Sequence, residues 1–167
     1  MRQRPPDACN LKPGDRPRVD GFFARDRVYF PAVRIRAQTA STLRALAADA
    51  PLEMVVSGNC MEPHLEGGDR IRVSAQRFYL PGDIVAFRRE DSRLLVHRVL
   101  GYTLSHRGLR LMAKGDGLSR EDEPVALNGV LGRVVARQGR AIESSMSTRL
   151  SSLRKFLRVF VRRSIRP

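Results

Sequence analysis

The chain has 167 residues, 42% of them hydrophobic, which suits one domain with a sizeable core. Its 31 lysines and arginines outnumber 17 aspartates and glutamates, giving a formal net charge of +14. So basic a protein is attracted to polyanions, although charge alone does not distinguish nucleic acid from an anionic membrane. No stretch approaches the ~20 apolar residues of a membrane-spanning helix, and the polar, proline-broken N-terminus does not resemble a signal peptide. We therefore expect a cytoplasmic protein.

The first segment, residues 1–37, is expected to be a partly disordered leader. It begins with a stretch rich in proline and arginine and continues with mixed aromatic residues and arginines. At its end, VRIRA (33–37) alternates like a short strand. Residues 39–49 then predict a short helix, with Thr39 or Ser41 as the N-cap and Pro51 ending it.

From Leu52 to about Ala136, short apolar stretches alternate with turn residues. The predicted strands lie in EMVVSG, DRIRVS, DIVAFRR, RLLVHRVLGY, GLRLMAKG and GVLGRVVAR, which are separated by glycine, proline, aspartate and serine. Short strands with hairpin-length links favour a mostly β domain, a barrel or a folded sheet, over a layered α/β fold. We place this domain at residues 38–140.

The C-terminal segment, residues 141–167, has a different character. Apolar residues recur at helical spacing at Met146, Leu150, Leu153, Leu157 and Phe160, and seven basic residues but no acidic one lie between positions 149 and 166. This pattern predicts a basic amphipathic helix. Two interpretations are open. The apolar stripe could pack on the β domain, or residues 144–166 could bind an anionic membrane surface and hold the protein at the inner face of the membrane.

The sequence contains two cysteines, Cys9 and Cys60. A disulfide between the leader and a loop of the β domain is not expected in a reducing cytoplasm, so we expect the Cys60 thiol to be reduced. Two cysteines, three scattered histidines and no CxxC motif do not make a zinc site. Neither a phosphate-binding loop nor a dinucleotide fingerprint is present, so we expect no metal and no cofactor.

Five short blocks follow one another through the β region: SGNCMEPHLEGGD (57–69), PGDIVAF (81–87), VHRVLG (96–101), KGDGLSRED (114–122) and GVLGRVV (129–135). In this order and spacing they resemble the peptidase domain shared by type I signal peptidases and the self-cleaving LexA-like repressors. The resemblance covers residues 52–136, about half of the chain. It implies a folded, barrel-like β-sheet and an endopeptidase that cleaves a precursor or leader peptide.

The resemblance also implies catalytic residues. Cys60 falls where the family has a serine nucleophile before Met-x-Pro, and a thiolate can attack a carbonyl in the same way. His97 falls at the position of the general base, which is lysine in bacterial signal peptidases and histidine in those of the endoplasmic reticulum and archaea. Asp122 falls on the acid that orients this histidine, and Asp116 is an alternative for that role.

The turn before the nucleophile would supply the oxyanion hole. Backbone amides around Cys60, with the side chains of Ser57 or Asn59, could donate hydrogen bonds to the developing charge. Each site residue also has a simpler interpretation. Cys60 could be a small core residue, His97 a strand residue hydrogen-bonded in the core, and the two aspartates a turn former and a solvated acid.

Two other functions are consistent with the sequence. A self-processing regulator of the LexA type would need a cleavable bond before the peptidase domain, and ALAADAP (45–51) offers suitably small residues. A non-catalytic basic binding module on the same fold would act through its arginines. We expect a peptide or protein substrate and no specific nucleic acid, because the few aromatic residues do not interleave with basic ones as in RNA-binding surfaces.

Overall fold

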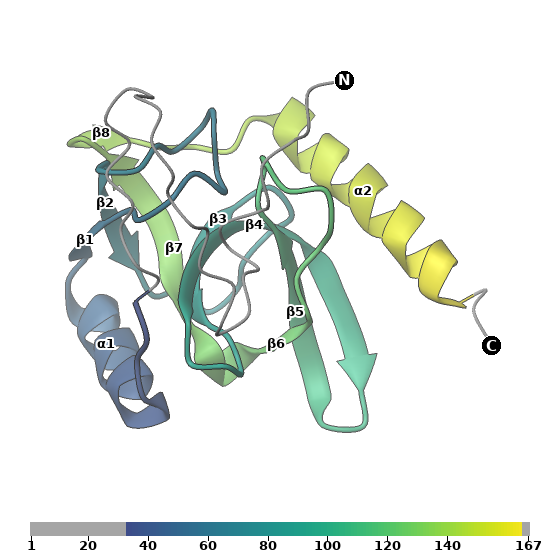
Figure 1. Ribbon diagram of the computed structural model, residues 1–167, viewed down its shortest axis with the longest axis horizontal. Coiled ribbons are helices and arrows are strands. Elements are labelled where there is room, and N and C mark those ends of the chain that lie inside the picture. Colours follow the sequence, from purple (N-terminus) through teal and green to yellow (C-terminus); the bar gives the residue numbers. More distant parts are fainter. Residues whose placement is uncertain (1–32, 165–167) are drawn as a thin grey trace, which may run out of the picture.

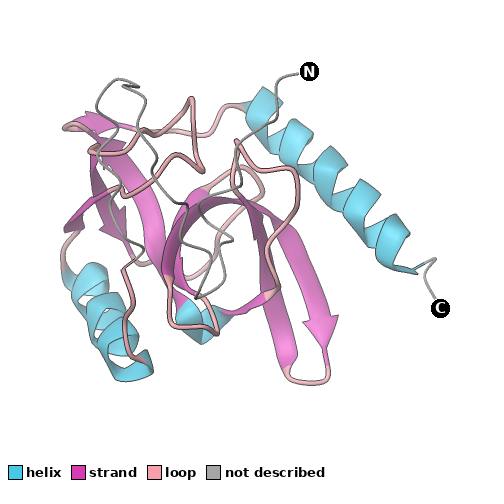
Figure 2. Cartoon of the chain, in the orientation of Figure 1, coloured by secondary structure: helices cyan, strands magenta, loops and turns pink. Residues whose placement is uncertain are grey.

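The structure is a computed structural model that describes residues 33–164, so most of the expected leader lies outside the described residues. Within this range the protein is mostly β. An antiparallel sheet curves into a half-barrel, accompanied by helix α1 (Ala37–Asp49) before it and helix α2 (Met146–Ser164) after it (Figure 2).

The sheet is built from strands that are neighbours in space but not always in sequence. Its strands are β1 (Leu52–Val55), β2 (Arg70–Ser74), β3 (Ile84–Arg88), β4 (Leu94–Ser105), β5 (Gly108–Lys114), β6 (Val125–Ala126), β7 (Val130–Arg137) and β8 (Arg140–Ala141). Their order is β1-β2-β7-β3-β4-β5-β6, with β8 paired to β7, and a short 3-10 helix (Leu127–Gly129) joins β6 to β7. Strand β1 therefore forms one edge of the described sheet.

Each predicted apolar stretch between residues 53 and 137 contains one strand, which confirms this part of the prediction. In β2, Ile71 and Val73 are buried while Arg70 and Arg72 are exposed, because side chains alternate between the two faces of a strand. In β3, residues 84–87 are all buried, as expected for a strand covered on both faces.

The core has two main parts. One part surrounds Leu65, Ile71 and Leu131 and is covered by α1, which packs near β7 in Figure 1. The other surrounds Phe87 and Leu111, inside the curve of β3, β4 and β5. The half-barrel therefore encloses apolar side chains from both halves of the chain.

The start of the described chain differs from the prediction. Helix α1 begins at Ala37, and Arg36 at its N-cap makes no side-chain capping hydrogen bond, so neither predicted cap residue has that role. The predicted strand at residues 33–37 is wrong. Only Arg34 forms an isolated bridge, with Arg93, because the chain turns into the helix before a ladder can form. The helix ends at Asp49, shortly before Pro51, as predicted.

Helix α2 runs along the outside of the sheet beside β4 (Figure 1). Its Phe156 and Val159 pack with Leu100 and Met112 in a small apolar cluster. The ring of Phe156 lies so close to Gly101 that a Cβ there would be 2.8 Å from it, so this approach requires glycine. Neither helix within residues 33–164 combines the length and apolar character needed to cross a bilayer.

Candidate active site

The loop from residue 56 to residue 69 carries Cys60 and is closed at its base. The Val56 amide donates to the Asp69 carbonyl, and the Gly68 amide donates to the Val56 carbonyl, both at 2.9 Å. Cys60 and Met61 are buried within the loop, and Met61 belongs to the core cluster. Hydrogen bonds thus join the two ends of the loop, and its middle packs into the core, which holds Cys60 in a defined position.

Asp69 fastens the same loop through its side chain. Its carboxylate accepts hydrogen bonds from the Glu66 amide and from Gln138, and pairs with Arg137 at 2.7 Å. Burial raises the pKa of the Asp69 carboxyl, but the hydrogen bonds from Glu66 and Gln138 and the Arg137 guanidinium outweigh burial. The net pKa is therefore below the usual value of 3.8.

His97 lies in β4 opposite Val85 of β3, with only 1% of the residue exposed. The ring of Phe87 meets its imidazole edge-on, with the ring centroids 6.0 Å apart. On its Nδ1 side, His97 is 2.5 Å from Oδ2 of Asp122, a residue that is also buried. The Asp122 amide donates to the Ala113 carbonyl of β5 at 2.9 Å, which fixes the backbone that presents the carboxylate.

This contact sets the chemistry of the imidazole. A carboxylate can only accept, so its partner Nδ1 carries the proton and Nε2 is left as the basic nitrogen. The carboxylate also stabilises the imidazolium that forms when Nε2 takes up a proton. The structure therefore brings His97 and Asp122 together, in an arrangement that would suit a general base and an acid that orients it.

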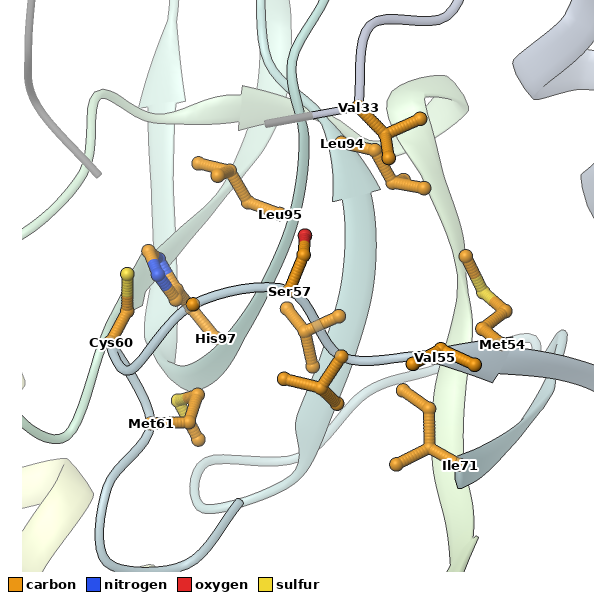
Figure 3. A pocket seen from close by; sticks show the side chains of 13 residues that line it. Val33, Met54, Val55, Ser57, Cys60, Met61, Ile71, Leu94, Leu95 and His97 are labelled. Atoms are coloured by element: carbon orange, nitrogen blue, oxygen red, sulfur yellow. The ribbon is translucent and has the colours of Figure 1, made fainter. Parts of the chain in front are cut away.

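Cys60 and His97 line the same pocket. Figure 3 shows the Cys60 sulfur and the His97 ring at one end of this pocket, with the Ser57 hydroxyl also within it. The remaining lining is almost entirely apolar: Val33, Met54, Val55, Val56, Gly58, Met61, Ile71, Leu94, Leu95 and Val96. The pocket thus joins a sulfur, a base and a hydroxyl to a surface suited to apolar side chains.

The candidate oxyanion-hole residues are only partly brought together. Ser57 lines the pocket, whereas Asn59 is exposed and lies outside the pocket lining. The Asn59 carbonyl accepts from the Glu62 amide at 3.1 Å, within the turn that follows. Of the two predicted side-chain donors, Ser57 is therefore the one that lines the pocket with Cys60.

Asp116, the alternative acid, has other partners. Its carboxylate makes a forked contact with the Arg98 guanidinium at 2.6–3.2 Å, and it also lies 3.1 Å from Nδ1 of His64. Arg98 itself is 6% exposed and donates through Nη1 to the Gly82 carbonyl at 2.8 Å. This cluster was not foreseen. Its signal in the sequence was an arginine next to His97 within the mainly apolar stretch 94–101, because a buried arginine needs a partner.

The turn that carries Asp116 also supports Cys60. The Gly117 amide donates to the Cys60 carbonyl at 2.9 Å. A Cβ on Gly115 would lie only 2.7 Å from the same carbonyl oxygen, so a larger residue would push the two loops apart. The glycines of this turn therefore allow its backbone to approach and hold the Cys60 loop.

The expected reduced thiol is not what the structure contains, because Cys60 is disulfide-bonded. Cys9, the second cysteine of the sequence, lies outside the described residues. The expectation relied on a reducing compartment and on the location of Cys9 in the leader. However, neither determines whether two sulfur atoms meet, because the entropic cost of closing a long loop grows only with the logarithm of its length. Any nucleophilic role for Cys60 requires its reduction first.

Comparisons of the chain with protein-family models and with curated proteins found no match. Among the described residues, no group of three or more histidines, cysteines and acids could hold a metal ion. A sulfur nucleophile, an oriented imidazole and an apolar pocket together suit acyl transfer.

Proposed function

We propose that the protein is an endopeptidase with a signal-peptidase/LexA-like fold that cleaves a precursor or leader peptide, using Cys60 as nucleophile and His97 as general base. The observation that carries this proposal is the buried hydrogen bond between His97 and Asp122, located at a pocket that Cys60 also lines. A buried histidine that needed only a hydrogen-bond partner would not have to share a pocket with a cysteine.

The reaction begins once Cys60 has been reduced by a thiol. Nε2 of His97 takes the Cys60 proton, and the sulfur attacks the scissile carbonyl carbon to form a tetrahedral oxyanion. The imidazolium then gives its proton to the leaving amine as the peptide C–N bond breaks, leaving a thioester on Cys60. Water, deprotonated by His97, hydrolyses the thioester and restores the thiol. Asp122 keeps the proton on Nδ1 throughout and balances the imidazolium charge.

A peptide substrate is supported by the position of β1. This strand forms an edge of the described sheet and leads directly into the Cys60 loop. An extended peptide could pair with such an edge through main-chain hydrogen bonds. Its side chains would then meet Val55 and the other apolar residues of the pocket. The resembled family prefers small residues before the scissile bond, and we expect the same preference at this apolar surface.

The direct test is cleavage of a peptide mixture by the full chain in excess dithiothreitol, with new N-termini identified by mass spectrometry. Reduced wild-type protein should generate a consistent set of termini, and Cys60→Ala should generate none. Cys9→Ala is the matched control, because it removes the other cysteine and should keep the activity. If the reduced protein produces no terminus that depends on Cys60, the disulfide is the role of this residue and the peptidase proposal is wrong.

A second measurement needs no substrate. An ordinary cysteine with a pKa of about 8.5 is only about 0.3% thiolate at pH 6. Transfer of its proton to an imidazole raises the thiolate fraction by about 300-fold. Such a thiolate is intrinsically less nucleophilic, which lowers its own reaction rate by about 30-fold. Iodoacetamide should therefore label reduced Cys60 about tenfold faster in the wild type than in His97→Ala. Equal rates would contradict activation by His97.

A further inference from the structure

Helix α2 has a face toward the sheet and a separate apolar face toward solvent. Ser152 and Val159 are buried against the sheet, and Phe156 is half-buried over Gly101. Near the start of the helix, Arg149 reaches Asp83 at 3.3 Å. These residues recur at intervals of three or four, so they define a single inward face.

The stripe that the sequence singled out lies elsewhere on the helix. Its residues are 42–79% exposed: Met146, Leu150, Leu153, Leu157 and Phe160, together with Val161. At a rise of about 1.5 Å per residue, this exposed stripe is roughly 20 Å long. The interpretation in which the stripe packs on the β domain is therefore wrong, because the smaller side chains of Ser152 and Val159 fit against the sheet instead.

The charges of α2 are all of one sign. Arg154, Lys155, Arg158 and Arg162 are exposed, and no acidic residue occurs between positions 146 and 164. At about 100° per residue, Arg154 and Arg158 lie beside the apolar stripe on the side away from the sheet. Their long side chains can extend around the stripe and carry their charges to a negatively charged surface.

We propose that α2 docks the protein on an anionic lipid bilayer, with the helix lying in the interface and its exposed stripe inserted at the boundary between headgroups and acyl chains. An exposed apolar stripe on a helix whose charged residues are all basic is the pattern of an interfacial helix. Pairing with a second copy is less favourable, because stripe-to-stripe contact would bring two basic surfaces together with no acid on either helix. This proposal goes beyond the peptidase activity and does not depend on it.

The geometry leaves the docking surface accessible. Figure 1 shows α2 along the outside of the molecule, on the opposite side of the sheet from α1. The pocket that contains Cys60 and His97 is formed by other parts of the chain: Val33 before α1, strands β1, β2 and β4, and the loop between β1 and β2. Contact with a bilayer through the exposed stripe therefore does not require any pocket residue.

The test is co-sedimentation of the full chain with vesicles of phosphatidylglycerol and phosphatidylcholine, compared with phosphatidylcholine alone. The wild type should pellet with the anionic vesicles, and less so as salt rises. Leu153→Gln/Leu157→Gln should weaken binding by at least tenfold. The matched control is Leu104→Gln/Leu109→Gln, which changes two exposed leucines of the β4–β5 hairpin and should bind like the wild type.

Two further double variants test the contribution of the basic residues to vesicle binding. Arg154→Gln/Arg158→Gln should weaken binding by on the order of 10-fold, since each basic residue near an anionic surface contributes several-fold. Arg107→Gln/Arg120→Gln removes two other exposed charges and should have little effect if α2 is the docking surface. Circular dichroism would show that each variant remains folded.

Three results would overturn the proposal. The first is failure of the wild type to pellet with anionic vesicles. The second is equal weakening by the α2 variants and by their matched controls, which would indicate attraction by net charge alone. The third is a dimer, seen by analytical ultracentrifugation, that Leu153→Gln/Leu157→Gln dissociates. Cys60→Ala should bind vesicles like the wild type, so loss of peptidase activity would not be confused with loss of docking.

Discussion

Replacing Asp122 by asparagine should separate the chemistry of the site from its stability. The change keeps the size of the side chain but removes its charge. An asparagine amide can donate to Nδ1 of His97, which would move the imidazole proton to Nε2 and leave no base facing the nucleophile. In a Ser-His-Asp site this change lowers turnover by about 10⁴. Since each tenfold is about 1.36 kcal/mol, we expect to lose roughly 5 kcal/mol of transition-state stabilisation.

The same variant should be almost as stable as the wild type. The Asp122 backbone is held by its amide bond to the Ala113 carbonyl, and asparagine can still hydrogen-bond His97. The net loss is then about 1 kcal/mol, the usual contribution of one hydrogen bond. For a protein of this size that corresponds to a decrease of about 2–4 °C in Tm. Turnover of a cleaved peptide and differential scanning calorimetry, both on reduced protein, measure the two effects.

Two carboxamide variants in the same loop serve as controls. Glu123→Gln removes an exposed charge next to Asp122 and should leave turnover within a factor of two or three. Asp116→Asn weakens the forked contact with Arg98 and should lower Tm more than Asp122→Asn does, with a smaller loss of turnover. If Asp116→Asn abolished turnover while Asp122→Asn left it unchanged, the assignment of the orienting acid would be refuted.

Three further changes test other contacts. Asp69→Asn should destabilise the protein by about 1–3 kcal/mol at pH 6. Because the pKa of Asp69 is lowered in the folded protein, its stabilisation is present above pH 3.8 and is lost as pH falls through the folded pKa. In urea unfolding, the difference in unfolding free energy between wild type and variant should therefore shrink below pH 3.8. Gly101→Ala should cost about 1–3 kcal/mol through collision with Phe156, and adding Phe156→Leu should recover part of it in thermal unfolding. Arg98→Ala should cost about 3–5 kcal/mol by removing the guanidinium from the Asp116 carboxylate, which would keep only His64 beside it among the described residues, whereas Arg98→Lys should cost less. Equal effects of the two substitutions would show that charge is irrelevant there.

The strands could be predicted because their burial is regular. Alternation in β2 and the apolar run in β3 follow directly from how a strand presents its side chains to a core. The orientation of α2 could not be predicted in this way. Its most apolar face is exposed, and the face against β4 is the one whose side chains pack well there: Phe156 lies on a glycine, and Ser152 is only 1% exposed. A hydrophobic pattern identifies an amphipathic helix without identifying which face meets the core.

The candidate site, too, could be predicted only in part. His97 and Asp122 are 25 positions apart, and no local periodicity links them, so their pairing was expected only through the resemblance. The contact between Arg98 and Asp116 was not expected, because an isolated GD pair is explained equally well by a turn. The disulfide at Cys60 was missed because neither the expected compartment nor the location of a cysteine in a leader determines which sulfur atoms meet in the fold.

Adjacent positions on β4 hold His97 and Arg98, and consecutive side chains of a strand point to opposite faces. Both are bound by the same connection after β5, through Asp122 on one side and Asp116 on the other. This connection thus straddles the strand, and its Gly117 amide also holds the Cys60 carbonyl. Any movement of this connection away from β4 would break both the contact between Asp122 and His97 and the contact between Asp116 and Arg98. We therefore expect this part of the site to be rigid and to move little when a substrate binds.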